Sequence, residues 1–423
     1  MFLEGNMKLL FVLLTLILTN INYGNAEEYL SLDSAVREAL ESNPEIKAAR
    51  SRWESYTKIP SQVATLPNPT IGVRFKNVSF SEITLGEDPR SDVQAFIIQE
   101  IPFPGKLSSK KKIALEKSES QKWAVDSTSR RIIANLKEAY YDWFFIRKSI
   151  DITKRNKDLL ETFVRTTEVK YEVGKGIQQD VLKAQVELST FIQRIELLEM
   201  KRQIIEARIK NILNRPQQSD LGMPEEIDKS ILNISIDQFY EIAKNKSPTL
   251  KQMSEMVDSK QEELKLARKQ YYPDFVLQAT YFSRDGGSQQ LDNLWQVGLG
   301  LKVPLYFWRK EKLGVQEAEL NLKEVKEIYE DTTNTILFEI KDKYITANTA
   351  EKLMGLYRNG IIPQSRISLE SAISGYQVGD VDFLTLLSSI VTLFNFEIEY
   401  YKQLSQYQTS LARLEEITGV DLI

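Results

Sequence analysis

The chain has 423 residues, of which 42% are hydrophobic and 27% are charged, and its formal net charge is −4. These values argue against wholesale disorder and against a basic surface for nucleic acid. Cysteine and histidine are both absent, which excludes disulfides, thiolate or imidazole metal sites, and enzymes that depend on a Cys nucleophile or a His base. We therefore expect neither an enzyme nor a bound cofactor or metal.

The first 26 residues have the features of a secretory signal peptide. Lys8 precedes an apolar stretch that ends near Leu18, and Gly24-Asn25-Ala26 supplies small residues where a signal peptidase cuts. The apolar stretch is too short to span a bilayer comfortably as an anchor, and no later segment is predicted to be a membrane-spanning helix. The sequence therefore predicts export from the cytoplasm.

The rest of the chain contains two copies of one pattern. Pro44 and Pro69 recur at positions 248 and 273, both at an offset of 204 residues. The offset is 202 between Ile101-Pro102 and Val303-Pro304, and 205 between the tetrapeptides that begin at Tyr171 and Tyr376. We therefore divide the mature chain into a first repeat (27–215), a connector with turn-forming residues (216–233) and a second repeat (234–423).

Each repeat is predicted to open with two helices and two strands. Asp33 and Asp237 stand at N-cap positions of short amphipathic helices. A longer helix follows Pro44 and ends before Pro60 or Pro67, and its counterpart runs from 248 to about 271. Alternating apolar and polar residues then predict strands at about 70–80, 92–101, 275–284 and 294–304, with polar hairpin tips at 81–90 and 285–293. Strands of this length cross a membrane at a tilt, although a half-buried soluble sheet has the same pattern.

A long helical hairpin completes each repeat, over 106–214 and 309–419. Residues 106–169 contain no Pro or Gly, and an unbroken helix there would be about 95 Å long. From Ile177 to Leu198 apolar residues recur at alternating spacings of four and three, as in a coiled coil. Four strands cannot close a barrel, because an open edge in lipid leaves backbone groups unpaired, so a membrane sheet would require an oligomer.

Several motifs follow one another on this duplicated frame. They are Ser31-Leu32-Asp33 with Asn43-Pro44, Leu66-Pro67-Asn68-Pro69, the QEIPFPGK segment 99–106, Tyr171-Glu172-Val173-Gly174, the DVLKAQ segment 180–185 and Tyr376-Gln377-Val378-Gly379. With them the chain resembles the TolC-like outer-membrane factors, which are outer membrane efflux proteins, over essentially the whole mature chain. The PFPGK segment is similar to members that work with metal-cation and resistance-nodulation pumps.

The resemblance implies a mainly α-helical, internally duplicated fold. In this family three chains share a twelve-stranded outer-membrane β-barrel, which continues into a trimeric barrel of long coiled-coil helices. The implied location is the outer membrane of a Gram-negative cell, with an extension into the periplasm. The implied function is a passive exit duct of a tripartite efflux or secretion system. Its partners would be two further copies of the chain, a periplasmic adaptor (membrane fusion) protein, an inner-membrane transporter of the resistance-nodulation type and outer-membrane lipid, with no nucleic acid.

The two helical turns are the expected adaptor-docking region at the periplasmic tip. The residues implied there are Val173, Gly174, Gly176, Asp180, Val378 and Gly379. The glycines also have a backbone explanation, because tight turns favour positive φ, and both interpretations can hold together.

Acidic residues near the same turns are candidates for the channel aperture. Repeated by a threefold axis, Asp180, Asp380 and Asp382 would ring the channel mouth with negative charge, although ordinary solvated loop carboxylates give the same pattern. Some family members constrict the entrance with an Asp pair at the positions that match Thr385 and Ser388. This sequence lacks that pair, so that particular gate does not carry over.

Two further clusters have more than one explanation. Lys106, Lys110, Lys111 and Lys112 follow the predicted strand and form either an interfacial collar for lipid headgroups or a solvated helical face. The aromatic cluster fits interhelical packing better than a ligand site; its members are Tyr140, Tyr141, Trp143, Phe144 and Phe145.

Two other functions compete with the duct. One is a periplasmic coiled-coil scaffold protein without a channel, whose strands form a soluble sheet and which would wash off membranes with salt. The other is an enzyme that uses carboxylates, but no phosphate-cradling glycine motif is present and no two acids are predicted to converge. The sequence leaves open whether metal, drug or protein is exported.

Overall fold

The computed structural model describes residues 29–77, 90–284 and 291–422. The predicted signal peptide and most of both strand-hairpin tips lie outside these residues. The described chain is mainly α-helical and forms two compact units. Counting the described residues only, unit 1 lies within Met1–Ala39, Leu136–Lys229 and Leu353–Ser405, and unit 2 within Leu40–Asn135, Ser230–Lys352 and Gln406–Ile423.

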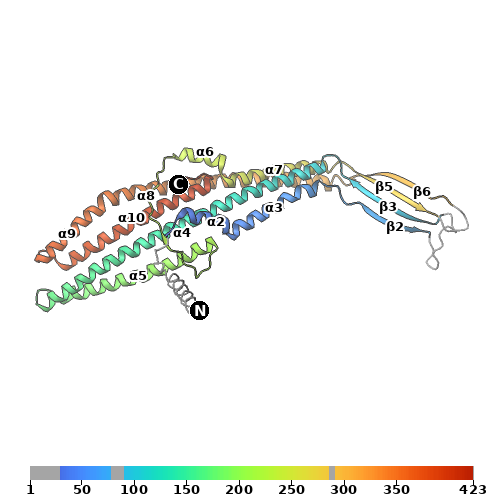
Figure 1. The fold of residues 1–423 in the computed structure, drawn as a ribbon. Coiled ribbons are helices and arrows are strands. Elements are labelled where there is room, and N and C mark those ends of the chain that lie inside the picture. The colour runs from blue at the N-terminus through green and yellow to red at the C-terminus, as the bar shows by residue number, and fades with distance from the viewer. Residues whose placement is uncertain (1–28, 78–89, 285–290, 423) are drawn as a thin grey trace, which may run out of the picture. The chain divides into compact units, whose positions relative to one another are not determined.

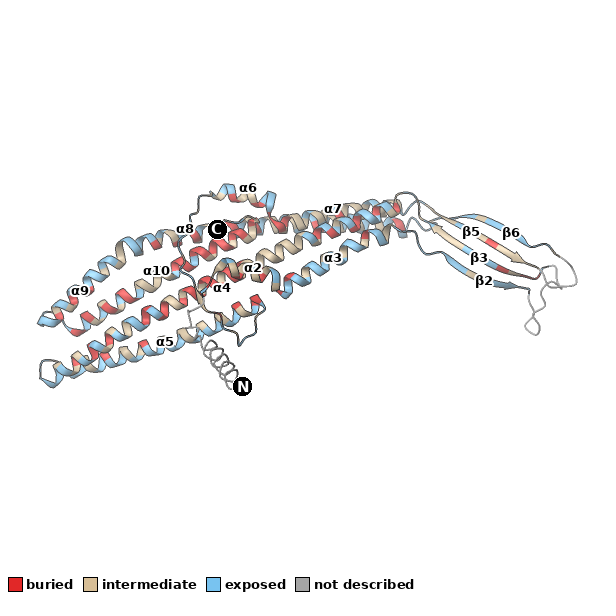
Figure 2. Cartoon of the chain, viewed as in Figure 1, coloured by how far each residue is buried: buried red, intermediate tan, exposed pale blue. Residues whose placement is uncertain are grey.

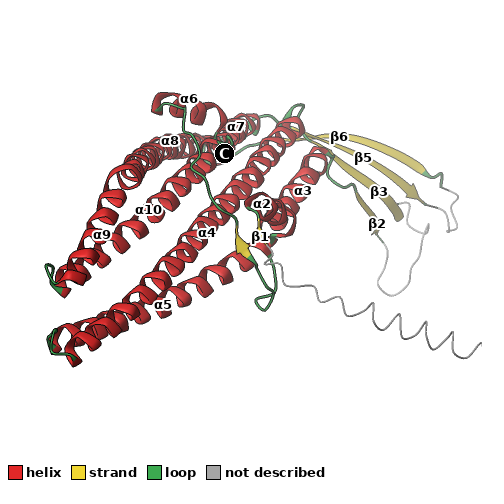
Figure 3. Cartoon of the chain, turned by 60° about the vertical axis from the view of Figure 1, so that its left-hand side comes forward, coloured by secondary structure: helices red, strands yellow, loops and turns green. Residues whose placement is uncertain are grey.

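The order of elements in the first part of the chain recurs in the second (Figure 1). The first series is α2 (Leu32–Ser42), α3 (Pro44–Ala64), β2 (Thr70–Lys76), β3 (Asp92–Ile101), α4 (Lys106–Glu172) and α5 (Gln178–Leu213). The second series is α6 (Ile236–Lys246), α7 (Pro248–Lys269), β5 (Asp274–Ser283), β6 (Leu294–Lys302), α8 (Lys310–Leu356), the π-helix η1 (Tyr357–Ile361), α9 (Ile362–Val378) and α10 (Phe383–Thr418). Strand β1 (Tyr29–Leu30) pairs in parallel with β4 (Met223–Pro224); Figure 3 shows β1 beside α2.

The starts of the short helices are fixed by serines rather than by the predicted aspartates. Ser31 Oγ accepts the backbone N–H of Ser34 at 3.2 Å. Ser235 forms a capping box with Gln238, in which each side chain accepts the other residue's backbone N–H. Asp33 and Asp237 instead lie in the first turn, where a carboxylate still interacts favourably with the helix dipole.

One long helix ends at the later of its two predicted boundaries, and another differs from the sequence prediction. Helix α3 continues through Pro60, which is buried, and ends at Ala64, shortly before Pro67. A proline removes one helical hydrogen bond, and here that cost does not end the helix. The first arm of the second hairpin is interrupted by η1, which is followed by Pro363. A π-helix in this position accommodates an extra residue in the helical repeat.

A four-stranded antiparallel sheet belongs to unit 2, in the order β2-β3-β5-β6. Its register places residues in rows across the sheet, such as Val73, Ala95, Tyr281 and Trp295. The strands β2 and β6 are exposed along almost their whole length (pale blue in Figure 2). Each has a strand on one side only within the described residues.

The helices of unit 2 pack α4 against α7 in antiparallel. Ser120 Oγ donates to the carbonyl of Gln252 at 3.2 Å, and Lys117 pairs with Glu263 at 2.7 Å. Between these contacts Glu255 faces other acids. Burial, a hydrogen bond with Glu116 and the charges of Glu116, Asp258 and Glu119 raise the pKa of Glu255 to about 7. The packing therefore brings like charges together in this part of unit 2.

The core of unit 1 joins the two helical hairpins. Phe191 on α5 and Phe394 on α10 pack with ring centroids 4.8 Å apart, inside a cluster that also holds buried residues of α4 and α9. The alternating apolar positions of α5 supply Ala184 and Phe191 to this cluster. Among the described helices, α10 alone is long and apolar enough by composition to cross a membrane. Its buried residues Phe383, Leu386 and Ile390 contribute to this protein core.

Candidate functional site

The turn between α4 and α5 is built on glycine. Gly174 adopts a φ of +73°, and the backbone N–H of Lys175 donates to the carbonyl of Lys170 at 2.8 Å, closing the helix end. Gly176 has a steric reason instead, because a Cβ there would lie 3.2 Å from the Cβ of Lys170. Val173 is 61% exposed, so the turn presents an apolar side chain.

The turn between α9 and α10 is closed in a different way. Gly379 adopts a φ of +91°, and the carbonyl of Gly375 accepts the N–H groups of Gly379, Asp380 and Val381 at 2.9–3.3 Å. Asp382 Oδ1 then accepts the N–H of Thr385 at 2.7 Å. This hydrogen bond lowers the pKa of Asp382.

Unit 1 brings these two turns together. Lys170 Nζ donates to the backbone carbonyl of Tyr376 at 2.8 Å. It also lies 3.6 Å from the centroid of the Tyr376 ring, so a cation–π contact reinforces the hydrogen bond. Burial, followed by the charge of Asp382, raises the pKa of Asp180. Asp180 and Asp382 therefore lie within electrostatic reach of each other.

Of the remaining aperture candidates, Thr385 is hydrogen-bonded to Asp382, whereas Asp380 and Ser388 have no contact with Asp180 or Asp382 among the interactions of the described residues. Asp380, Thr385 and Ser388 are all exposed. Ser388 lines a hollow between α9 and α10 whose other polar residues include Ser365, Ser368 and Thr392. This hydroxyl-rich hollow was not predicted, because the serines and threonines of two different helices have no common spacing in the sequence.

The sheet of unit 2 has two chemically distinct faces. The cross-strand register places these residues on one face: Ile71, Val73, Phe75, Val93, Ala95, Ile97, Leu277, Ala279, Tyr281, Trp295, Val297 and Leu299. Many of them are highly exposed, for example Ile71 at 74% and Val297 at 74%. A large exposed apolar face of this kind is unusual on a surface in water and is expected where the surrounding medium is lipid.

The opposite face carries most of the polar residues and all the glycines of the sheet, among some apolar side chains. Its rows include Arg74 with Gln94, and Gln278 with Gly298. Phe96 lies on this face over Gly72, where a Cβ would come within 2.5 Å of the ring, and the Arg74 guanidinium lies 5.2 Å from the Phe96 centroid. The two faces of the sheet therefore differ in polarity, and the first is the more apolar.

The junction of sheet and helices corrects one prediction. Lys106 is only 4% exposed, and its Nζ donates to Asp274 Oδ1 and to the Tyr272 carbonyl, both at 2.8 Å. Phe103 stacks on Tyr272 with ring centroids 4.5 Å apart. Lys106 is therefore a buried ion-paired residue and belongs neither to a headgroup collar nor to a solvated face. Sequence reasoning missed this because its partner lies more than 160 residues away. Lys110, Lys111 and Lys112 are exposed.

The aromatic cluster of α4 packs inside unit 1. Tyr140, Tyr141, Trp143 and Phe144 are buried. The Tyr140 hydroxyl donates to the Leu30 carbonyl at 2.7 Å and accepts the Glu225 N–H at 2.9 Å, and burial raises its pKa to about 12. This hydroxyl joins the start of the described chain to the connector.

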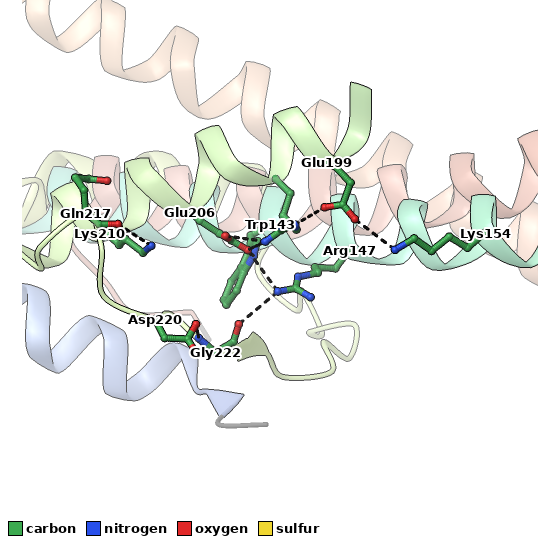
Figure 4. A network of polar contacts seen from close by, with 10 residues as sticks. Trp143, Arg147, Lys154, Glu199, Glu206, Lys210, Gln217, Asp220 and Gly222 are labelled. Carbon is green, nitrogen blue, oxygen red and sulfur yellow. Dashed lines mark hydrogen bonds and ion pairs between the residues drawn. The ribbon is translucent and has the colours of Figure 1, made fainter. Parts of the chain in front are cut away.

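A polar network beside this cluster ties the connector to α4 and α5 (Figure 4). Glu206 accepts hydrogen bonds from Trp143 Nε1 at 3.0 Å, from Arg147 at 3.4 Å and from Arg202 at 2.8 Å. Arg147 also donates to the Gly222 carbonyl at 3.5 Å. These charge-assisted contacts hold the connector in place, and among the described residues no cluster of acids suited to a metal ion is present.

Comparison with known proteins now decides the family. The family model for outer membrane efflux proteins matches residues 35–215 and again residues 239–420. The chain belongs to the outer membrane efflux protein family. It is accordingly an outer-membrane exit duct that extends into the periplasm of a Gram-negative cell, which confirms the resemblance given by its motifs.

Individual relatives are distant but cover almost the whole chain. The cobalt-zinc-cadmium resistance protein CzcC of Cupriavidus metallidurans is 20% identical over 405 residues, covering 92% of this chain and 90% of CzcC. The outer-membrane channel OprN has 16% identity and a TM-score of 0.80, covering 92% of this chain and 90% of that one. VceC of Vibrio cholerae has 14% identity and a TM-score of 0.78, with 93% and 97% covered. The two channels share the fold of this protein.

Proposed function

We propose that three copies of this efflux protein assemble into one continuous passive duct with twelve strands in the membrane. The observation that carries this proposal is the two-faced sheet, whose outer strands β2 and β6 each have a neighbouring strand on one side only within the described residues. An exposed strand edge in lipid leaves backbone N–H and C=O groups without partners, which costs several kcal/mol per group. Pairing β6 of one copy with β2 of the next satisfies both edges and places the polar face around a lumen.

Exposed apolar side chains on the long helices support the same assembly. On α5 they are Leu182, Val186, Leu197, Met200 and Ile204, and on α8 they are Leu313, Leu320, Phe338 and Ile345. Exposed apolar stripes of this length on coiled-coil helices favour contact with further helices. Neighbouring copies would cover them and complete the periplasmic barrel.

The two halves would derive from duplication of a single ancestral unit. The recurrence of the element order and the two successive matches to one family model support this origin. The repeats would span 27–215 and 234–423, joined by the connector at 216–233.

The periplasmic end of the duct would lie at the two helical turns, where a periplasmic adaptor docks. Val173 and Val378 are exposed there, and apolar side chains at a helical tip suit a protein partner. Asp380 and Asp382 from three copies would form an acidic aperture. Lys110, Lys111 and Lys112 would meet phosphate groups near the membrane boundary.

The exported substrates would include divalent metal cations, and the energy would come from an inner-membrane transporter of the resistance-nodulation type. Similarity to CzcC along almost the full length of both chains supports this substrate class. The duct itself would catalyse no reaction and would carry no cofactor.

A deletion strain tests the substrate class. Loss of the gene should lower the tolerated concentration of cobalt, zinc and cadmium, and the wild-type gene should restore it. Drug or dye sensitivity with unchanged metal tolerance would contradict the cation proposal.

Native mass spectrometry of the detergent-extracted protein tests the assembly: we expect the mass of three chains, and a monomer as the main species would contradict the trimer.

A further inference from the structure

A cavity of about 330 Å³ lies in unit 2, where β5 and β6 give way to the helices. Its lining combines charged residues with apolar ones, and the argument depends on Lys302, Lys310, Glu311, Leu305 and Tyr306. Lys106 and Asp274 also border it, but they are paired with each other at 2.8 Å. The charges available to a ligand are therefore those of Lys302, Lys310 and Glu311.

Glu311 provides the acceptor. Its side chain is 9% exposed, and its Oε2 atom is buried with no hydrogen-bond partner among the described residues. Buried polar atoms nearly always have a partner, and a missing one calls for a ligand or another explanation. The most favourable donor to a buried carboxylate oxygen is a cation that carries N–H groups.

Two lysines provide the opposite charge. Lys302 is exposed and its ion pair with Glu100, at 2.9 Å, is largely solvated. Lys310 is exposed and, within the residues that the structure describes, has no ion-pair partner. A ligand that fits both sides of the cavity must carry an anion and an N–H cation in one small group.

The position of the cavity identifies the kind of molecule. It lies just beyond Leu301 and Phe275, the last apolar row of the sheet. The exposed run that follows is strongly apolar and aromatic, with Leu305 67%, Tyr306 71%, Phe307 51% and Trp308 57% exposed. Aromatic side chains next to lysines are typical of the boundary between hydrocarbon and headgroups.

We propose that this cavity binds the phosphoethanolamine headgroup of a phospholipid in the periplasmic leaflet of the outer membrane. The lipid phosphate lies between Lys302 and Lys310, and the ammonium donates to Glu311 Oε2. The acyl chains leave the cavity along Leu305 and Tyr306. This site rests on the membrane placement of the sheet in the proposed function.

Native mass spectrometry of the full-length assembly in detergent tests the site. The protein is titrated with phosphatidylethanolamine, phosphatidylcholine, phosphatidylglycerol and the soluble O-phosphoethanolamine. Phosphatidylethanolamine should bind about tenfold more tightly than phosphatidylcholine, whose quaternary amine has no N–H to donate, and than phosphatidylglycerol, which has no amine. Weak binding of O-phosphoethanolamine that competes with the lipid supports recognition of the headgroup itself.

Variants locate the binding. Glu311→Gln should remove most of the preference for phosphatidylethanolamine over phosphatidylcholine, and Lys310→Gln should weaken binding of all three phospholipids. The matched controls are Glu327→Gln and Lys312→Gln, exposed residues of α8 that do not line the cavity, and both should bind as wild type.

Equal affinity for the three lipids, or an unchanged preference in Glu311→Gln, would overturn the site. Single-channel recordings of the same proteins separate this failure from failure of the duct. Wild-type protein that conducts normally but shows no lipid preference contradicts only the headgroup site, whereas wild-type protein that never conducts contradicts the proposed function.

Discussion

The sheet of unit 2 and the helical core of unit 1 use the same kinds of side chain in opposite ways. In the core, Phe191 and Phe394 are almost completely buried against each other. In the sheet, Ile71, Val297 and Leu299 are more than two-thirds exposed. Burial against protein explains the first arrangement, whereas the second is stable only if the medium itself is apolar. Apolar side chains are therefore covered by protein in the core of unit 1, whereas the exposed apolar side chains of the sheet indicate contact with lipid.

The largest effect should come from a cavity in the helical core. Phe394→Ala removes a buried ring, and we expect a loss of about 3–5 kcal/mol in the free energy of unfolding. The thermal unfolding midpoint of the detergent-extracted protein measures this loss. Leu384→Ala, at an exposed position of the same helix, is the control and should shift the midpoint much less. Equal shifts would mean that α10 does not pack into a core at Phe394.

A charge on the apolar face of the sheet should have the next largest effect. Leu277→Arg places a guanidinium where we expect lipid, at a cost of about 2–4 kcal/mol near the middle of the membrane. The amount of heat-resistant oligomer in outer-membrane fractions should fall. Gln278→Arg, the next residue on the polar face, should assemble normally. If Gln278→Arg impaired assembly more than Leu277→Arg, the face that carries Gln278 would be the one that meets lipid.

Removal of the acids at the α9–α10 turn should alter conduction, and it also removes the hydrogen bond between Asp382 and the Thr385 N–H, at a cost of about 0.5–2 kcal/mol. Asp380→Ala with Asp382→Ala removes charge from the proposed aperture, so single-channel conductance should rise or block by divalent cations should weaken. The Glu187→Gln variant on α5, away from the turn, is the control. If conductance and divalent block both stay at wild-type values, these acids do not form an aperture.

The smallest effect concerns pH and the acidic contact between α4 and α7. Because folding raises the pKa of Glu255 to about 7, the folded protein binds a proton that the unfolded chain releases at lower pH. Stability should therefore fall as pH rises from the ordinary carboxyl range towards 7, and then level off. Glu255→Gln should remove this dependence and raise the thermal midpoint at pH 8 by about 2 °C or less. If Glu255→Gln kept the wild-type dependence of stability on pH, the proton taken up on folding would belong to another group. The control, Glu327→Gln, should keep the wild-type dependence.

Much of the fold was accessible from the sequence, because it follows from local periodicity. The alternation at 275–284 and 294–304 is reproduced by β5 and β6, and the coiled-coil spacing places Ala184 and Phe191 in the core. What the sequence could not provide depends on partners distant in the chain. The burial of Lys106 requires Asp274, and the contact between the turns requires Lys170 to meet Tyr376. Serine caps and the π-helix η1 were missed because aspartate and an unbroken helix fitted the local pattern equally well.

The central claim is that the two faces of the sheet meet lipid and water, and the absence of cysteine makes a direct measurement simple. Single cysteines are introduced at five successive positions of the central strand β5: Val276, Leu277, Gln278, Ala279 and Thr280. Cells or proteoliposomes are then treated with a water-soluble maleimide. We expect labelling at 276 and 278, and protection at 277 and 279, where a nitroxide lipid should instead quench an attached fluorophore; Thr280 is buried and should label weakly. Uniform labelling of all five positions, or labelling with the opposite alternation, would contradict the membrane sheet on which this account of the duct depends.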